Sequence, residues 1–405
     1  MELYSGFKTE TDPETGRQLI RLTEWDAFCY PLYYFIPSVT DDGRFLVYHR
    51  CDETGVQLWV LDLKSGKHRQ LTHAANNADE AQWRPWCTPC GEGVLDHRSV
   101  LNSVSNTVIF YDRNVAREID IETLVERDLF ILPPDRYPIS QSCVTPDGKW
   151  FVFSHIDKSF YHEMTAGNWS EYLKYRPLTK DCTIQAYNLE TGEMRDILIL
   201  NAVMHHIIPY GNEYFAVNHP PTESGILFTG LEGRWYTHIR TKSADGRVAN
   251  HCAATQRGIV YEASKFHGDN CGGIYHPFTH RFIEYKLPAF FGYTHTGYDP
   301  KGDLIFYENL NYDDTGIHCH NMYKMSRYEP DGPCGWELLM GNRPTFGSRS
   351  SQKSHFHPRV TPDNRYILFT GGYEKTRTNQ LYLLDIGDVE PTENLPDLST
   401  KALKI

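Results

Sequence analysis

One phrase recurs four times along the chain, a turn followed directly by a run of aromatic and β-branched residues. Glycine or asparagine completes each turn, and both tolerate the positive φ of tight turns. Each run that follows is typical of a buried β-strand. The four copies are Asp42-Gly43 before Phe45–Tyr48, Pro146–Gly148 before Trp150–Phe153, Pro300–Gly302 before Leu304–Tyr307, and Pro362–Asn364 before Tyr366–Phe369. The repetition predicts an all-β fold built from similar sheets.

The spacing of the copies indicates how many sheets there are. The turns at 43, 148, 302 and 364 are 105, 154 and 62 residues apart, which corresponds to two, three and one units of about 50 residues, the length of a propeller blade. Counting the ends, seven units result. The segment Thr15–Thr23 repeats the closing half of a strand–turn–strand phrase whose opening half is Gln380–Asp385. We therefore predict a single seven-bladed β-propeller over residues 1–405, closed by an N-terminal strand that completes the last blade.

Composition narrows the class of protein further. The 40 Lys and Arg stand against 52 Asp and Glu, a formal net charge of −12. This acidic balance disfavours a groove that follows nucleic-acid phosphates. Charged residues make up 23% and hydrophobic residues 40% of the chain, so intrinsic disorder is excluded. The aromatic share of 13% favours sheet over helix.

The same reading places the protein in the cytoplasm. The N-terminus shows no secretory signal, no apolar run is long enough to span a bilayer, and ten cysteines are too few for a disulfide scaffold. Cys87 and Cys90 have zinc or redox spacing but no second pair follows. We interpret Tyr161-His162-Glu163 and His318-Cys319-His320 as exposed or hydrogen-bonded loop residues, and Ser159–Thr179 as an insertion outside the blades.

Histidines recur at the first strand of four successive units, where the innermost strands of a propeller converge on the central channel. On an extended strand, His355 and His357 point to the same face, and Gln352 lies in the loop before them. Two imidazoles and an amide oxygen suit several divalent metals, including Mn, Fe, Co, Ni and Zn. The preceding units carry His295, His251 and the pair His205-His206. The pattern predicts one shared site at the channel axis.

The string Gln352–Pro358, followed by Thr361–Asn364, resembles the metal-binding strand of the oligogalacturonate lyases. The opening Asp12–Thr23 and the segment Tyr33-Tyr34-Phe35 are similar to the start of the same family, and the resemblance runs in order over nearly the whole chain. It implies a seven-bladed propeller that acts on short pectin-derived uronides in the cytoplasm, with a bound manganese ion.

The resemblance also implies roles for individual residues. The metal ligands would be Gln352, His295, His355 and His357, and His251 would be the catalytic base. Arg234 is the nearest match to a site arginine. Substrate contacts would come from His206, His219 and Lys353. His219 is followed here by Pro220-Pro221, which departs from the family pattern, so the reaction type is better determined than the sugar.

The reaction implied is β-elimination of short 4-linked uronic-acid oligosaccharides such as digalacturonate. A divalent ion would neutralise the carboxylate while His251 removes the proton on C5. One alternative is a lyase on the same scaffold that cleaves a different uronide, such as a glucuronate-containing disaccharide. The other is a propeller without catalytic activity whose histidines are structural.

Overall fold

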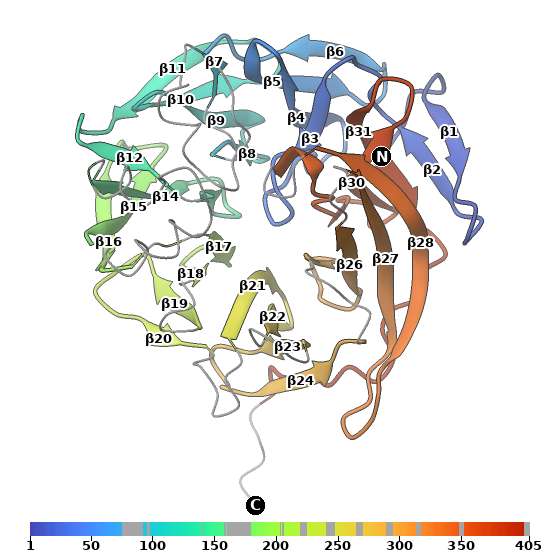
Figure 1. The fold of residues 1–405 in the computed structure, drawn as a ribbon. Helices are drawn as coiled ribbons and strands as arrows, with labels where there is room; N and C mark the ends of the chain where they lie inside the picture. The colour runs from blue at the N-terminus through green and yellow to red at the C-terminus, as the bar shows by residue number, and fades with distance from the viewer. Residues whose placement is uncertain are drawn as a thin grey trace, which may run out of the picture.

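The computed structural model describes residues 1–74, 92–94, 98–139, 141–157, 159, 180–202, 204, 206–218, 225–239, 248–264, 270–288, 295–312, 317–347 and 352–400. In these residues the strands form seven sheets arranged in a ring around a central axis (Figure 1). The prediction of a seven-bladed β-propeller is therefore confirmed. The expected loop residues Cys87 and Cys90, the motif Tyr161–Glu163 and the insertion beyond Ser159 lie outside the described residues.

Blades 1 to 3 are each built on antiparallel meanders that run outward from the axis. Blade 1 consists of β3 (Phe28–Pro31), β4 (Phe45–Asp52), β5 (Gly55–Asp62) and β6 (Lys67–Gln70), with β7 (Glu92–Gly93) parallel to β5. Blade 2 consists of β8 (Val100–Asn102), β9 (Thr107–Asp112), β10 (Val115–Asp120) and β11 (Glu126–Ile131). Blade 3 consists of β12 (Arg136–Pro138), β13 (Cys143–Val144), β14 (Trp150–Asp157), β15 (Cys182–Asn188) and β16 (Met194–Leu200).

Blades 4 to 6 repeat the same order with four strands each. Blade 4 consists of β17 (Ile207–Tyr210), β18 (Tyr214–Asn218), β19 (Ile226–Gly230) and β20 (Thr237–His238). Blade 5 consists of β21 (Val248–Thr255), β22 (Gly258–Ser264), β23 (Cys271–Tyr275) and β24 (Phe282–Lys286). Blade 6 consists of β25 (Thr296–Tyr298), β26 (Ile305–Tyr312), β27 (Ile317–Arg327) and β28 (Gly335–Phe346).

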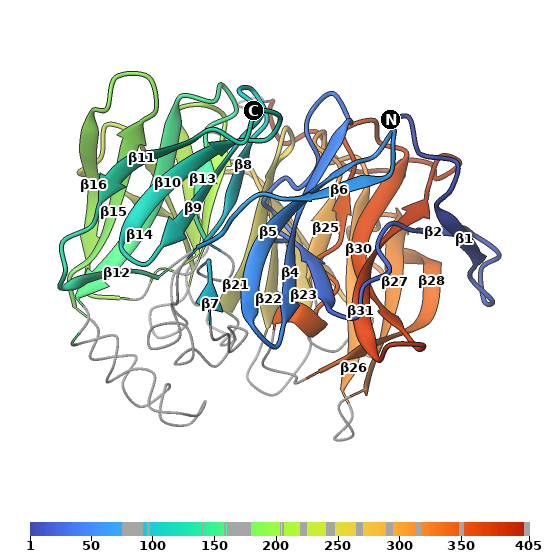
Figure 2. The ribbon, with the colours of Figure 1, turned by 90° about the horizontal axis from the view of Figure 1, so that it is seen from above.

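Blade 7 joins the two ends of the chain. Its inner strands are β29 (Arg359–Val360), β30 (Tyr366–Tyr373) and β31 (Thr378–Asp385), and its outer strands are β2 (Gln18–Arg21) and β1 (Lys8–Thr11). Strand β2 pairs antiparallel with β31, with Leu19 opposite Leu384. Figure 2 shows β1 and β2 outside β31 at one edge of the ring. The predicted closure by an N-terminal strand is confirmed.

The four repeated turns fall between the first and second strands of blades 1, 3, 6 and 7, so the intervals of two, three and one units are correct. Gly302 and Asn364 complete two of these turns with φ of 80° and 57°, which few other residues adopt without strain. The runs after the turns are the second strands, and their side chains are almost wholly buried. Within the part of the chain that is described, no helix has the length and hydropathy needed to cross a membrane.

The first strand of blade 1 is interrupted in a way that shapes the channel. Pro31 lies opposite Tyr48, and Val39 lies opposite Leu46. The chain therefore advances by eight residues on the first strand while it advances by only two on the second. The extra residues, 32–37, leave the strand and return, and the Ser38 hydroxyl accepts a hydrogen bond from the N–H of Leu32 (2.9 Å). The residues of this loop from 32 to 36 are all buried, and Figure 1 shows the loop reaching toward the middle of the ring. We call residues 32–37 the channel loop.

Candidate metal and active site

The first strands of blades 4 to 7 bring five histidines together. His206 lies directly before β17, His251 lies within β21, His295 lies directly before β25, and His355 and His357 precede β29. All five are buried, with at most 6% of their surface exposed. The first strand of each blade lies nearest the central axis. Residues that are far apart in sequence therefore meet there. The predicted convergence of these histidines is thus observed.

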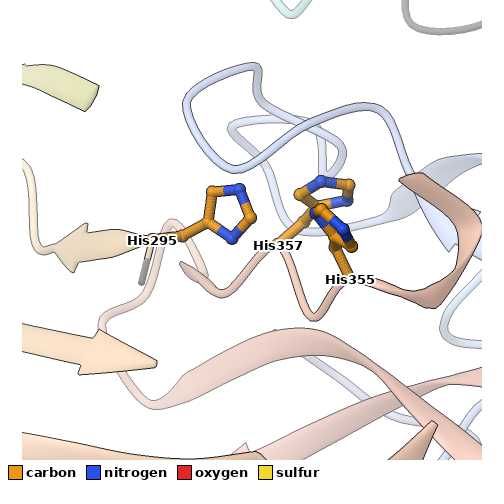
Figure 3. A group of neighbouring side chains, drawn as sticks. All are labelled: His295, His355 and His357. Carbon is orange, nitrogen blue, oxygen red and sulfur yellow. The ribbon is translucent and has the colours of Figure 1, made fainter. Parts of the chain in front are cut away.

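Three of the rings are close enough to share an ion. One ring nitrogen each of His295, His355 and His357 lies within 4.8 Å of the others, and Figure 3 shows the three imidazoles gathered around one space. His295 comes from blade 6, whereas the other two come from the loop that leads into blade 7. Three neutral imidazoles in this arrangement form a nitrogen donor set that suits a divalent transition metal.

His251 and His206 extend the cluster away from this triad. The centroid of the His251 ring lies 5.1 Å from that of His295 and 5.5 Å from that of His206, with which it is stacked at 21°. His251 is therefore a direct neighbour of His295, one of the three potential ligands, without belonging to their set.

Two of the histidines are each held by a glutamate from the second strand of the same blade. His251 Nδ1 lies 2.9 Å from Glu262 Oε1, and His295 Nδ1 lies 2.8 Å from Glu308 Oε2. A carboxylate accepts a hydrogen bond from a ring N–H. In the neutral imidazole the proton is therefore on Nδ1, and Nε2 keeps its lone pair for a proton or a metal ion.

Glu308 contacts a second histidine with its other oxygen. His320 Nδ1 lies 2.7 Å from Glu308 Oε1. Burial raises the pKa of the Glu308 carboxyl, but the two histidines outweigh burial and hold this pKa well below its usual value. The carboxyl is therefore ionised and accepts both hydrogen bonds. His318, Cys319 and His320 all lie in β27, and both histidines are buried. The prediction that they are loop residues is therefore wrong, because β26 and β27 continue past the site as a long hairpin.

The channel loop covers the cluster with two tyrosines. The Tyr33 hydroxyl lies 3.2 Å from His206 Nε2, and the Tyr33 ring lies 4.7 Å from that of His357. The Tyr34 ring lies 5.1 Å from that of His295, and its hydroxyl donates to the carbonyl of Cys252. Burial raises the pKa of Tyr34 well above its ordinary value. Tyr34 is therefore neutral, and both tyrosine rings pack against imidazoles of the cluster.

The structure places the remaining predicted residues in different ways. Both ring nitrogens of His206 have partners, Tyr33 Oη and Asn218 Nδ2 (3.3 Å), so His206 holds the channel loop in place. Lys353 lies in the 3-10 turn η2 (Gln352–Ser354), with its ammonium 4.2 Å from the centre of the Phe28 ring. The side chain of Gln352 and the whole of His219 lie outside the described residues.

Arg234 is not brought to the histidines. It is exposed in the turn between β19 and β20, the outer strands of blade 4, and its backbone N–H donates to the carbonyl of Ile197 in β16, the outer strand of blade 3. Figure 1 shows this region at the rim of the ring. The outer strands of a blade lie far from the axis. The structure therefore does not support the prediction that Arg234 is the site arginine.

The two glutamates were missed by sequence reasoning, although a signal was present. Glu308 directly follows the run Leu304–Tyr307, and Glu262 directly follows Ile259–Tyr261. The residues of these two runs are buried and hydrophobic. A carboxylate at the end of such a run needs a buried partner, and the histidine on the adjacent first strand supplies it.

Comparison with known proteins identifies the family. The family model of the oligogalacturonate lyases matches residues 2–226, more than half of the chain. An oligogalacturonate lyase of Dickeya dadantii is 23% identical over 415 residues, covering 96% of this chain and 98% of the relative. An oligogalacturonide lyase of Pectobacterium atrosepticum is 22% identical over 409 residues, covering 94% of this chain and 96% of the relative.

Two solved structures share the fold over almost their full length. An oligogalacturonate lyase in complex with manganese is 20% identical with a TM-score of 0.77, covering 95% of this chain and 98% of that one. An oligogalacturonate lyase of Vibrio parahaemolyticus is 18% identical with a TM-score of 0.76, covering 95% of this chain and 97% of that one. At such identities these likenesses concern the fold, which they match from the first blade to the last. With its family model matched over residues 2–226, the chain belongs to the oligogalacturonate lyase family.

Proposed function

We propose that the protein cleaves short 4-linked uronic-acid oligosaccharides, such as digalacturonate, by metal-assisted β-elimination. The observation that carries the proposal is the buried triad His295, His355 and His357, with His251 beside it. Membership of the oligogalacturonate lyase family supports the substrate class. A small acidic oligosaccharide is thus the expected partner.

The donor set fits a divalent cation. Three ring nitrogens within 4.8 Å of one another are typical ligands for a transition metal. Gln352 precedes His355 by three residues in sequence and is a source of a fourth, oxygen ligand. We favour manganese because a solved structure of the same fold is an oligogalacturonate lyase in complex with manganese. When bound, such an ion would act as a Lewis acid that offsets the negative charge of the uronate carboxylate.

His251 is the proposed base. In β-elimination, the C5–H electron pair becomes the C4–C5 double bond while the bond from C4 to the glycosidic oxygen breaks. Nε2 of His251 would accept the C5 proton, because Nδ1 is held by Glu262. The proton is then available for the departing oxygen, directly or through solvent, so the reaction consumes no net acid. An imidazole suits this task because its ordinary pKa lies near neutrality.

Positioning of the substrate would depend on groups at the mouth of this site. Lys353 is two residues from His355 and only partly exposed, and its ammonium is a candidate contact for a uronate carboxylate. The chain as a whole carries a net charge of −12, so attraction of an anionic sugar must come from local cations. His206 would act indirectly, by holding Tyr33.

The test is incubation of the purified protein with Mn²⁺ and digalacturonate, followed by the ultraviolet absorbance of the unsaturated product. We expect turnover that is abolished by a chelator and restored by Mn²⁺. No turnover on digalacturonate, with turnover on a glucuronate-containing disaccharide, would instead identify a lyase for another uronide. This alternative is motivated by Pro220-Pro221 after His219.

A thermal melt separates both lyases from a propeller without catalytic function. An ion that binds only the folded state raises the melting temperature with concentration. We expect such a rise on adding Mn²⁺ to chelator-treated protein. An unchanged melting temperature together with a metal-free purified protein would favour the non-catalytic alternative.

A further inference from the structure

A chain of buried hydrogen bonds joins the two segments that carry the potential metal ligands. From these contacts we infer that Glu308, together with His320 and Thr345, is a positioning unit that holds His295 and the His355–His357 segment in register for metal binding. The inference rests on the proposed function, because it assumes that these three histidines are ligands. Glu308 itself would not touch the ion.

The first half of the unit acts on blade 6. Glu308 Oε2 accepts from His295 Nδ1 (2.8 Å), and Oε1 accepts from His320 Nδ1 (2.7 Å). At most 2% of the surface of these three side chains is exposed. Because each carboxylate oxygen is used by a different imidazole, rotation of the carboxylate would break both contacts. His295 is thereby held in one tautomer and one orientation.

The second half of the unit reaches the other ligand segment. His320 Nε2 lies 2.7 Å from the hydroxyl of Thr345 in β28, and this hydroxyl donates to the carbonyl of Ser354 (2.7 Å). Ser354 directly precedes His355. Thr345 and Ser354 are fully buried, so water does not compete for these bonds.

The face of the His320 ring also supports the His355–His357 segment. The ring of His320 is stacked on that of Phe356, with centroids 4.0 Å apart and an angle of 13°. Phe356 stands between His355 and His357 in sequence and is fully buried. His320 therefore supports the segment at two points: through Thr345 at the carbonyl before His355, and directly at the Phe356 side chain. Blades 6 and 7 are coupled at the site by these contacts.

Glu262 offers a matched control within the same chain. It occupies the position in β22 that Glu308 occupies in β26, and it is also buried. Its contact is with His251 (2.9 Å), the proposed base. Replacement of Glu308 by Gln should therefore weaken binding of the ion. The same replacement of Glu262 should instead slow turnover.

The experiment compares Glu308→Gln, Thr345→Val and Glu262→Gln with the wild type, using Mn²⁺ alone in calorimetric titrations of metal-free protein. Loss of a residue that orients a ligand typically weakens metal binding by about 10–100-fold. We expect that loss for Glu308→Gln and a smaller loss for Thr345→Val. Glu262→Gln should bind Mn²⁺ within about threefold of the wild type but turn over more slowly. At saturating Mn²⁺, the electron paramagnetic resonance spectrum should change in Glu308→Gln and not in Glu262→Gln.

The outcomes separate this inference from the proposed function. If the wild type binds Mn²⁺ and both Glu308→Gln and Thr345→Val bind it equally well, the positioning role is overturned while the proposed function stands. Equal losses of affinity in Glu308→Gln and Glu262→Gln would also overturn it, since general destabilisation would then explain both. A wild type that binds no Mn²⁺ would overturn the proposed metal site and this inference with it. Thr345→Val decides the matter if Glu308→Gln does not fold.

Discussion

At the scale of residues, two histidine–glutamate pairs of the same design lie side by side. The contacts of His251 with Glu262 and of His295 with Glu308 differ by only 0.1 Å. Their surroundings differ, because His295 belongs to the triad with His355 and His357, whereas His251 stacks on His206. The proposed function accordingly gives one buried pair the task of holding an ion and the other that of moving a proton.

Replacing the proposed base should remove turnover and nothing else. In His251→Ala we expect activity on digalacturonate to fall by at least about 10²–10⁴-fold, the usual contribution of a general base. Mn²⁺ affinity should stay near that of the wild type, since His251 is outside the triad. Steady-state kinetics and metal titration measure the two quantities. Substantial remaining turnover would mean that another group removes the proton.

Replacing a proposed ligand should remove metal and turnover together. His355→Ala takes one nitrogen from a set of three, so Mn²⁺ affinity and activity should fall in parallel. Metal analysis after gel filtration, combined with the kinetic assay, tests this expectation. Full metal occupancy in His355→Ala would show that His355 is not a ligand.

At the scale of elements, strands that look equivalent in sequence have different roles. The first strand of blade 1 sends the channel loop toward the axis. In blades 4 to 7, the first strand or the residues just before it carry the five histidines instead. At the outside of the ring, β6 is the edge strand of blade 1. Its His68 side chain holds β6 against the neighbouring residues. Its Nδ1 lies 3.0 Å from the Tyr48 hydroxyl, and its ring packs edge-on against Trp25.

The fastening of β6 predicts a pH-dependent stability. Burial, and then the positive charge of Arg50, lower the pKa of His68 to about 4, below the ordinary value of about 6.5 in an unfolded chain. The folded state therefore prefers neutral His68, and this contribution to stability is complete above about pH 6.5 and is lost as the pH falls toward 4. Urea unfolding between pH 7 and 4 should show a shallower loss of stability in His68→Gln than in the wild type. The exposed His73 provides the control His73→Gln, which should keep the wild-type slope; identical slopes in all three proteins would contradict the prediction.

At the scale of the whole molecule, the ring depends on contacts between the ends of the chain. Strand β2 completes blade 7, and Leu19 packs into a core shared by blades 6 and 7. The C-terminal segment then runs along turns of blades 6 and 5, where Tyr328 N–H donates to the Glu393 carbonyl and Arg281 donates to that of Asp397. Strand β1 forms the outer edge of blade 7.

Weakening the closure should destabilise the molecule as a whole. Leu19 is 1% exposed, so Leu19→Ala should lower the free energy of unfolding by about 2–5 kcal/mol. Val125, on the surface of blade 2 and 66% exposed, gives the control Val125→Ala, with an expected change within about 0.5 kcal/mol. Denaturant unfolding measures both. Equal effects of the two substitutions would mean that β2 is not needed to close the ring.

The sequence by itself determined the seven blades, the closure and the gathering of histidines. Each of these depends on a periodic signal: turn residues such as Gly302 that need positive φ, alternating strands, and one histidine at the same place in successive units. Such signals can be read locally because a repeated unit imposes the same environment on the same position. The relation to the oligogalacturonate lyases likewise followed from the string Gln352–Pro358.

Only the tertiary structure decided which side chains act together. Glu262 and Glu308 lie on the second strands of their blades. Antiparallel pairing with the first strand places each of them next to a histidine. His320 reaches the site because the hairpin of β26 and β27 extends past it. Arg234, in contrast, lies at the rim because it follows the third strand of its blade. Distances across the axis depend on how the seven blades pack around it. The spacing of residues along the sequence does not contain this information.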